Sequence, residues 1–73
     1  VCPREVVKRA LENDAAALVF VHNHPSGNPN PSQDDLSITN KLKDALMSID
    51  VSVHDHIIIA GNDVYSFADH GLI

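Results

Sequence analysis

The stretch that decides the fold runs from residue 15 to residue 35 and reads AAALVFV, HNH, PSGNPNP and SQDD. It opens with a continuous apolar run, Ala15 to Val21, which predicts a strand buried on both faces. Three prolines and one glycine follow in residues 25–31, and they predict a loop with a rigid path. Ser32, with Asp35 three residues later, predicts the N-terminal cap of a helix.

Two helices flank the ends of this stretch. Pro3, in a first turn, and apolar residues at helical spacing predict a helix that ends at Asn13-Asp14. The helix that opens at Ser32 is expected to end near Asp50. Its buried stripe is predicted to consist of Leu36, Thr39, Leu42, Leu46 and Ile49.

The C-terminal third of the chain predicts strands. Residues 51–60 are rich in β-branched side chains and predict a second buried strand. Gly61-Asn62-Asp63 is a turn signal, so residues 64–66 can pair back as a hairpin. Ser66 is expected to cap a last short turn closed by Gly71. The order is helix, strand, helix, strand, strand, which indicates one α/β domain.

That domain looks incomplete. The chain has 73 residues and only two long predicted strands, and a stable sheet needs more partners. We therefore expect residues 1–73 to be the C-terminal part of a larger domain whose N-terminal strands lie outside this sequence. An open sheet edge would also invite pairing with another chain, so a homodimer is a further expectation.

Composition excludes several classes of function. The formal net charge is −5, and affinity for a phosphate backbone comes from Lys and Arg, so direct nucleic-acid binding is not expected. Arg4, Lys8 and Arg9 are interpreted as a solvated helix face. No apolar stretch approaches the ~20 residues of a membrane span. The single cysteine, Cys2, permits no internal disulfide, so the cytoplasm is the expected compartment. Cys2 is expected to pack at the helix start.

The chemistry of the chain lies in its histidines and Asp35. His22 and His24 are two residues apart in an extended segment, so both imidazoles can face one metal. A carboxylate at Asp35 can return to them as a third ligand. Two His and one Asp with an open position is the catalytic zinc pattern, and zinc lowers the pKa of a bound water towards ~7. We expect one zinc per chain, with the Ser32 hydroxyl placed to stabilise a developing oxyanion.

Simpler interpretations exist for each part. Ser32 and Asp35 alone would be a helix cap, and a lone His-x-His is common; only their conjunction favours the metal site. His54 and His56 repeat the same spacing and could hold a second metal. We favour a supporting role for His56 within the sheet or behind the metal ligands, because no third ligand follows. His54 is expected on the same face, and His70 in an exposed tail.

The pattern His-x-His, seven residues, Ser-x-x-Asp resembles the signature of the JAMM, or MPN-plus, metalloproteases. His22, His24, Ser32 and Asp35 occupy its four positions. The sequence around these four residues resembles the RadC branch of the family at several segments: Pro3-Arg4-Glu5-Val6, His22 to Gly27, Asp55-His56, Tyr65-Ser66-Phe67-Ala68 and Gly71-Leu72.

The resemblance implies a cytidine-deaminase-like three-layer sandwich with a mixed sheet. It also implies zinc-dependent hydrolysis of peptide or isopeptide bonds in an unidentified substrate. The family's mechanism uses a glutamate from an earlier strand, whereas Glu5 and Glu12 both fall on the first predicted helix. We therefore expect residues 1–73 alone to bind zinc without hydrolysis. The alternatives are a non-catalytic interaction module, or an accessory protein in DNA repair or a mobile element.

Overall fold

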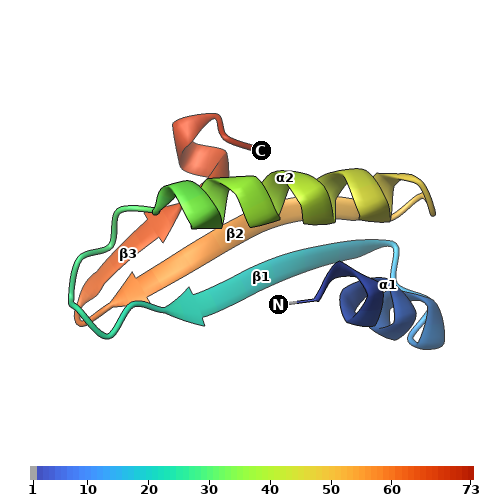
Figure 1. Ribbon diagram of the computed structural model, residues 1–73, viewed down its shortest axis with the longest axis horizontal. Coiled ribbons are helices and arrows are strands. Elements are labelled where there is room, and N and C mark those ends of the chain that lie inside the picture. Colours follow the sequence, from blue (N-terminus) through green and yellow to red (C-terminus); the bar gives the residue numbers. More distant parts are fainter. Residues whose placement is uncertain (1) are drawn as a thin grey trace.

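A computed structural model describes residues 2–73 and confirms the predicted order of elements (Figure 1). The elements are helix α1 (Pro3–Glu12), strand β1 (Ala17–Asn23), helix α2 (Gln33–Met47), strand β2 (Ser52–Ala60), strand β3 (Asp63–Ser66) and the short 3-10 helix η1 (Ala68–His70).

The three strands form one mixed sheet in the order β1-β2-β3. β1 and β2 are parallel, and α2 makes the long connection that parallel neighbours require. β2 and β3 are antiparallel and joined by a tight turn in which Gly61 has a φ of 59°. The α/β class and the mixed sheet are thus confirmed, and the arrangement is compatible with an α/β sandwich.

Both helices pack on the same side of the sheet. The core cluster joins Ala10 of α1 and Leu46 of α2 to Val51 and Val53, with Phe20 of β1 packed against it. The predicted stripe on α2 faces this core, since Thr39, Leu42 and Leu46 are buried and Leu36 is half-buried. Ile49, which was predicted to belong to the stripe, lies beyond the end of α2 and packs half-buried against the same core.

The prediction that β1 is buried on both faces is wrong for the residues described. Leu18 and Phe20 face the helices, but Val19 and Val21 are 52% and 58% exposed on the other side. The reason is that α1 and α2 cover only one face, and β1 is an edge strand among residues 2–73. A continuous apolar run does not reveal which of its alternating side chains another layer covers.

β2 contains a bulge that the sequence did not predict. Leu18 pairs with Val53 while its neighbour Val19 pairs with Asp55, so His54 is an extra residue in β2. His54 is exposed, and the prediction that it shares a face with His56 is wrong because the bulge interrupts the alternation. The bulge allows both halves of β2 to bury side chains: Val51 just before the strand, then Val53, His56, Ile58 and Ala60.

The ends of the elements follow the predicted signals, except at Cys2 and at the end of α2. α1 ends at Glu12 with Asn13 as its C-cap, and Asp14 follows with a φ of 49°. α2 ends at Met47 rather than near Asp50, which follows in a turn with a φ of 61°. The Ser66 hydroxyl accepts a hydrogen bond from the Asp69 amide at 3.1 Å, and Gly71 closes the last turn in a left-handed conformation. Cys2 is exposed at the N-cap of α1 rather than packed. No helix among residues 2–73 combines the length and apolarity needed to cross a membrane.

Candidate metal centre

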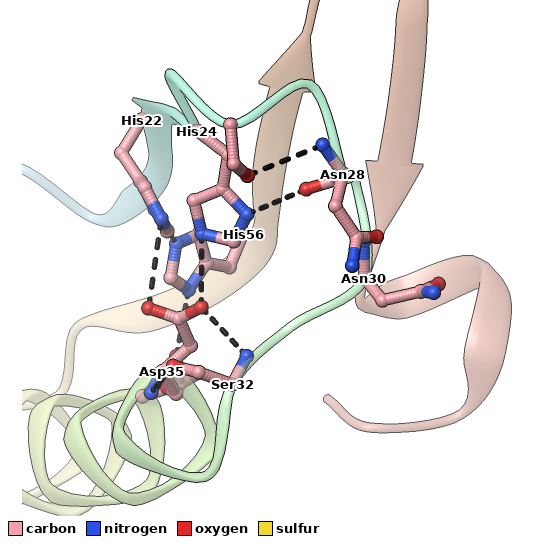
Figure 2. Close-up of polar contacts among 9 residues, drawn as sticks. His22, His24, Asn28, Asn30, Ser32, Asp35 and His56 are labelled. Atoms are coloured by element: carbon pink, nitrogen blue, oxygen red, sulfur yellow. Dashed lines mark hydrogen bonds and ion pairs between the residues drawn. The ribbon is translucent and has the colours of Figure 1, made fainter.

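The predicted metal ligands come together where β1 ends and α2 begins. His22 and His24 leave the end of β1, the proline-containing loop turns the chain, and Asp35 returns from the first turn of α2 (Figure 2). One ligand atom from each of the three side chains lies within 4.8 Å of the other two. Across residues 2–73 this is the single such group of His, Cys, Asp or Glu side chains, and it could hold a metal ion.

The Asp35 carboxylate presents one oxygen to each imidazole. His24 Nε2 lies 3.0 Å from Asp35 Oδ2, and His22 Nε2 lies 3.5 Å from Asp35 Oδ1. The two imidazole rings are tilted by 60° with their centroids 4.7 Å apart. Both Nε2 atoms therefore point into the same space as the carboxylate.

Ser32 and Asp35 are a helix cap and part of the candidate centre at once. The Ser32 hydroxyl accepts from the Asp35 amide at 3.0 Å, and the Ser32 amide donates to Asp35 Oδ2 at 2.8 Å, which completes a capping box. The cap fixes the carboxylate opposite the histidines. Ser32 is exposed, so its hydroxyl is accessible to a substrate.

The Asp35 carboxyl is held in its ionised form. Partial burial alone would raise its pKa, but hydrogen bonds from Ser32 and the charges of His22 and His24 outweigh that effect. The pKa of Asp35 is therefore below its ordinary value. An ionised carboxylate is the form that coordinates a metal.

The loop fixes the orientation of His24. Its Nδ1 lies 2.9 Å from the backbone carbonyl of Asn28. A carbonyl only accepts, so Nδ1 carries the hydrogen and Nε2 is the atom turned towards Asp35. The Asn28 amide donates to Ser26 Oγ, and Asn28 Oδ1 accepts from the Asn30 amide, which holds the carbonyl in place. The sequence predicted a stiff loop but gave no sign of this contact.

His56 supports the centre from beneath, as the sequence interpretation favoured. Its ring is 4% exposed and stacks on Phe67 with centroids 4.4 Å apart. His56 Nε2 lies 2.7 Å from His22 Nδ1, and His56 Nδ1 lies 2.6 Å from Thr39 Oγ1. Burial, then the charge of His22, lowers the pKa of His56 despite the opposing carboxylates.

Thr39 is a site-supporting residue that sequence reasoning missed. It was assigned to the buried stripe of α2, and it is indeed only 1% exposed. Its hydroxyl donates to the Asp35 carbonyl at 2.6 Å and also contacts His56. The available signal was a hydroxyl side chain among leucines and an isoleucine, since buried polar groups need partners.

Asp55 anchors the segment that carries Phe67. Asp55 Oδ1 accepts from the amides of His56 and Ala68 at 2.7 and 2.9 Å, and Ser66 Oγ donates to Oδ2 at 2.5 Å. Burial alone would raise the pKa of Asp55, but these hydrogen bonds and the nearby His56 lower it below the usual value. The carboxylate thus ties β2 to η1 and seats Phe67 against His56.

Both glutamates of the chain are remote from the centre. Glu5 and Glu12 lie on α1, and Figure 1 shows α1 at the start of β1, away from the loop that joins β1 to α2. No glutamate of residues 2–73 therefore lies beside the candidate ligands.

Comparisons with known proteins agree with the motif. A family model described as the RadC-like JAB domain matches residues 1–72. UPF0758 protein PSHAa2643 of Pseudoalteromonas translucida (strain TAC 125) is 60% identical over 73 residues, which are 100% of this chain and 33% of that protein. The UPF0758 proteins YfjY and YeeS of Escherichia coli (strain K12) are each 56% identical over 71 residues, which are 97% of this chain and 44% and 48% of those proteins. The chain spans between a third and a half of the length of these relatives. It belongs to the RadC-like JAB domain family.

Proposed function

We propose that this chain supplies the metal-binding part of a zinc-dependent hydrolase that cleaves peptide or isopeptide bonds. The observation that carries the proposal is the convergence of His22, His24 and Asp35 beside a serine hydroxyl. Membership of the RadC-like JAB family supports it.

The contact between His24 and Asp35 is one that a proton or a metal ion can bridge. The Asn28 carbonyl holds a hydrogen on Nδ1, so Nε2 is the atom that faces Asp35 Oδ2, 3.0 Å away. Two lone pairs facing each other at that distance repel unless a proton or a metal ion lies between them. With a carboxylate and two imidazoles around one point, zinc fits the donor set.

Each residue has a distinct task in this proposal. His22, His24 and Asp35 hold the ion and leave one position open. When bound, zinc supplies Lewis-acid chemistry, polarising a carbonyl and activating water. Ser32 donates its hydroxyl hydrogen to the oxyanion that develops on the substrate carbonyl. We further propose that the general base, a glutamate, comes from outside residues 1–73, so that these residues alone bind zinc without turnover.

The test is hydrolysis by the protein at its natural length, with zinc-loaded and chelator-treated samples compared. The substrates are a mixed library of internally quenched peptides and an isopeptide-linked probe. We expect turnover that requires zinc, is abolished in Asp35→Asn and is unaffected in His54→Ala, a matched change at an exposed histidine. Turnover that survives both chelation and Asp35→Asn would refute the proposal. Zinc binding with no turnover on any probe would favour a non-catalytic interaction module.

Two expectations from the sequence stay proposals. We propose a cytoplasmic location, which a single exposed cysteine is compatible with. We also propose a homodimer through the open edge of the sheet, to be tested by light scattering; a monomer at all concentrations would contradict it.

A further inference from the structure

We infer that Thr39 and His56 form a buried hydrogen-bond chain that fixes the tautomer of His22, keeping the hydrogen on Nδ1 and the lone pair of Nε2 towards the metal. The inference rests on the proposed function for its purpose, but the tautomer is a property of the metal-free protein. Thr39 and His56 are therefore positioning residues, which act through His22.

Three short contacts define the chain. Thr39 Oγ1 lies 2.6 Å from the Asp35 backbone carbonyl oxygen and 2.6 Å from His56 Nδ1. His56 Nε2 lies 2.7 Å from His22 Nδ1. Polar atoms this close attract only when a hydrogen lies between them. Each of the three contacts therefore needs one hydrogen.

The Asp35 carbonyl decides where those hydrogens go. It can only accept, so the single hydrogen of the Thr39 hydroxyl must point to it. The contact between Thr39 and His56 then requires a hydrogen on His56 Nδ1. His56 is buried and, in the described part of the chain, its ring nitrogens contact only Thr39 and His22, with no carboxylate to pair a charge, so the ring is uncharged and its bare Nε2 must accept from His22 Nδ1–H. In its neutral form His22 is then left with an unprotonated Nε2 facing Asp35 Oδ1.

The reverse arrangement fails on one contact. If Thr39 donated to His56 Nδ1, His56 Nε2–H would donate to His22 Nδ1, and His22 would carry its hydrogen on Nε2. That hydrogen would occupy the place of the metal. Thr39 Oγ1 would then face the Asp35 carbonyl at 2.6 Å with no hydrogen between two oxygens, which is repulsive.

Burial makes the hydrogen-bond chain selective for one arrangement of its hydrogens. Thr39 and His56 are 1% and 4% exposed, so water cannot readily replace a missing partner. The Phe67 ring stacked on His56 and the edge of Phe20 hold the imidazole in place. The hydrogen-bond chain also joins the backbone of one proposed metal ligand, Asp35, to the side chain of another, His22. It thereby connects α2 to β1 through β2.

The first test reads the tautomer directly. Long-range proton–nitrogen NMR spectra of the metal-free protein at its natural length, at about pH 8, above the ordinary histidine pKa of ~6.5, distinguish the two ring nitrogens. We expect His22 to carry its hydrogen on Nδ1 and His56 to carry its hydrogen on Nδ1. A wild-type protein with the hydrogen of His22 on Nε2 would overturn the inference.

The second test removes members of the hydrogen-bond chain by mutation and measures zinc affinity by chelator competition. Thr39→Val removes the hydroxyl at constant shape, and we expect the His22 hydrogen to shift to Nε2 and zinc affinity to fall roughly 10- to 100-fold. Thr39→Ser retains the hydroxyl and should restore both readouts. His56→Phe keeps a ring against Phe67 but removes the acceptor, and should weaken zinc binding similarly. His54→Phe, on the same strand but exposed, is the matched control.

The outcomes separate this inference from the proposed function. A folded Thr39→Val protein with unchanged His22 tautomer and unchanged affinity contradicts the inference, as does an equal loss of affinity in Thr39→Ser. A wild-type protein with the expected tautomer that binds no zinc supports the hydrogen-bond chain and contradicts the proposed function instead.

Discussion

Two pairs of histidines with the same spacing lie at the end of β1 and in β2, and their surroundings differ. His22 in β1 and His24 just after it continue the regular alternation, point to one side and contact Asp35. His54 and His56 straddle a bulge in β2, so His54 is exposed while His56 is buried behind His22.

The difference shows that an i, i+2 pair makes a metal centre only under two conditions. The strand must be regular between the two residues, so that both side chains share a face. A third ligand must also return to that face, as Asp35 does from the first turn of α2. β2 meets neither condition, and its one buried histidine serves the other pair.

The largest effect is expected from changing the alternation of β2. Deleting Ile57 would turn His56, and with it Val53 and Val51, away from the helices, at a cost of roughly 3 to 6 kcal/mol for the two valine side chains alone. Deleting His54 removes only the bulge and leaves every buried residue on its face, so the loss should be no larger than about 1 kcal/mol. Urea unfolding measures both. Equal losses in the two variants would contradict the assignment of the bulge.

The next effect concerns the two histidine pairs directly. His24→Ala removes a ligand, so zinc affinity should fall by more than the ~100-fold upper end found for outer partners. His54→Ala makes the same chemical change on β2 and should leave affinity unaltered. Calorimetric titration with zinc compares them. A comparable loss in His54→Ala would mean that the ion lies elsewhere.

A smaller effect is expected at Asp55, which seats Phe67 against His56. Asp55→Asn loses the ionised acceptor and should destabilise the fold by about 1–2 kcal/mol at pH 7. Because the folded-state pKa of Asp55 is lowered, its contribution is fully present above the unfolded value of ~3.9 and is lost as pH falls through the folded value. The gap between wild type and Asp55→Asn should therefore narrow only below about pH 4. A gap that closes between pH 7 and pH 5 would argue against this role.

The smallest effect on stability is expected at Ser32, where two variants distinguish its role as a helix cap from its proposed role as a hydrogen-bond donor to the substrate. Glycine in place of a capping serine costs only roughly a few tenths of a kcal/mol, so Ser32→Gly should leave thermal stability nearly unchanged, whereas Ser32→Ala should cost about 1 kcal/mol. Both variants lack a side-chain hydrogen-bond donor and should lose turnover alike, while zinc affinity stays within a few-fold of wild type in Ser32→Gly. Full turnover in Ser32→Gly would restrict Ser32 to its cap.

The sequence predicted those features of the structure that are determined by residues close together in the chain. Pro3, the Ser32–Asp35 pair and Gly61 mark element ends through backbone geometry, and the structure has each of them. The three candidate ligands were predicted because two of them are neighbours on a strand and the third opens the next helix.

The features that the sequence did not predict depend on contacts between residues far apart in the chain. The bulge at His54 arises from how Leu18 and Val19 align with β2, which no local pattern encodes. The exposure of Val19 and Val21 depends on which face the helices cover. Thr39 and Asn28 acquire their roles from contacts with His56 and His24, respectively. The sequence pattern of an apolar helix stripe or of a proline-rich loop is the same whether or not these contacts form.

X-ray absorption spectroscopy of the zinc-loaded protein tests the central claim most directly. The account predicts one zinc per chain with only nitrogen and oxygen neighbours at about 2.0–2.1 Å, two of them imidazoles, and loss of the signal in Asp35→Asn. A sulfur neighbour at about 2.3 Å, or an unchanged spectrum in Asp35→Asn, would contradict a centre formed by His22, His24 and Asp35.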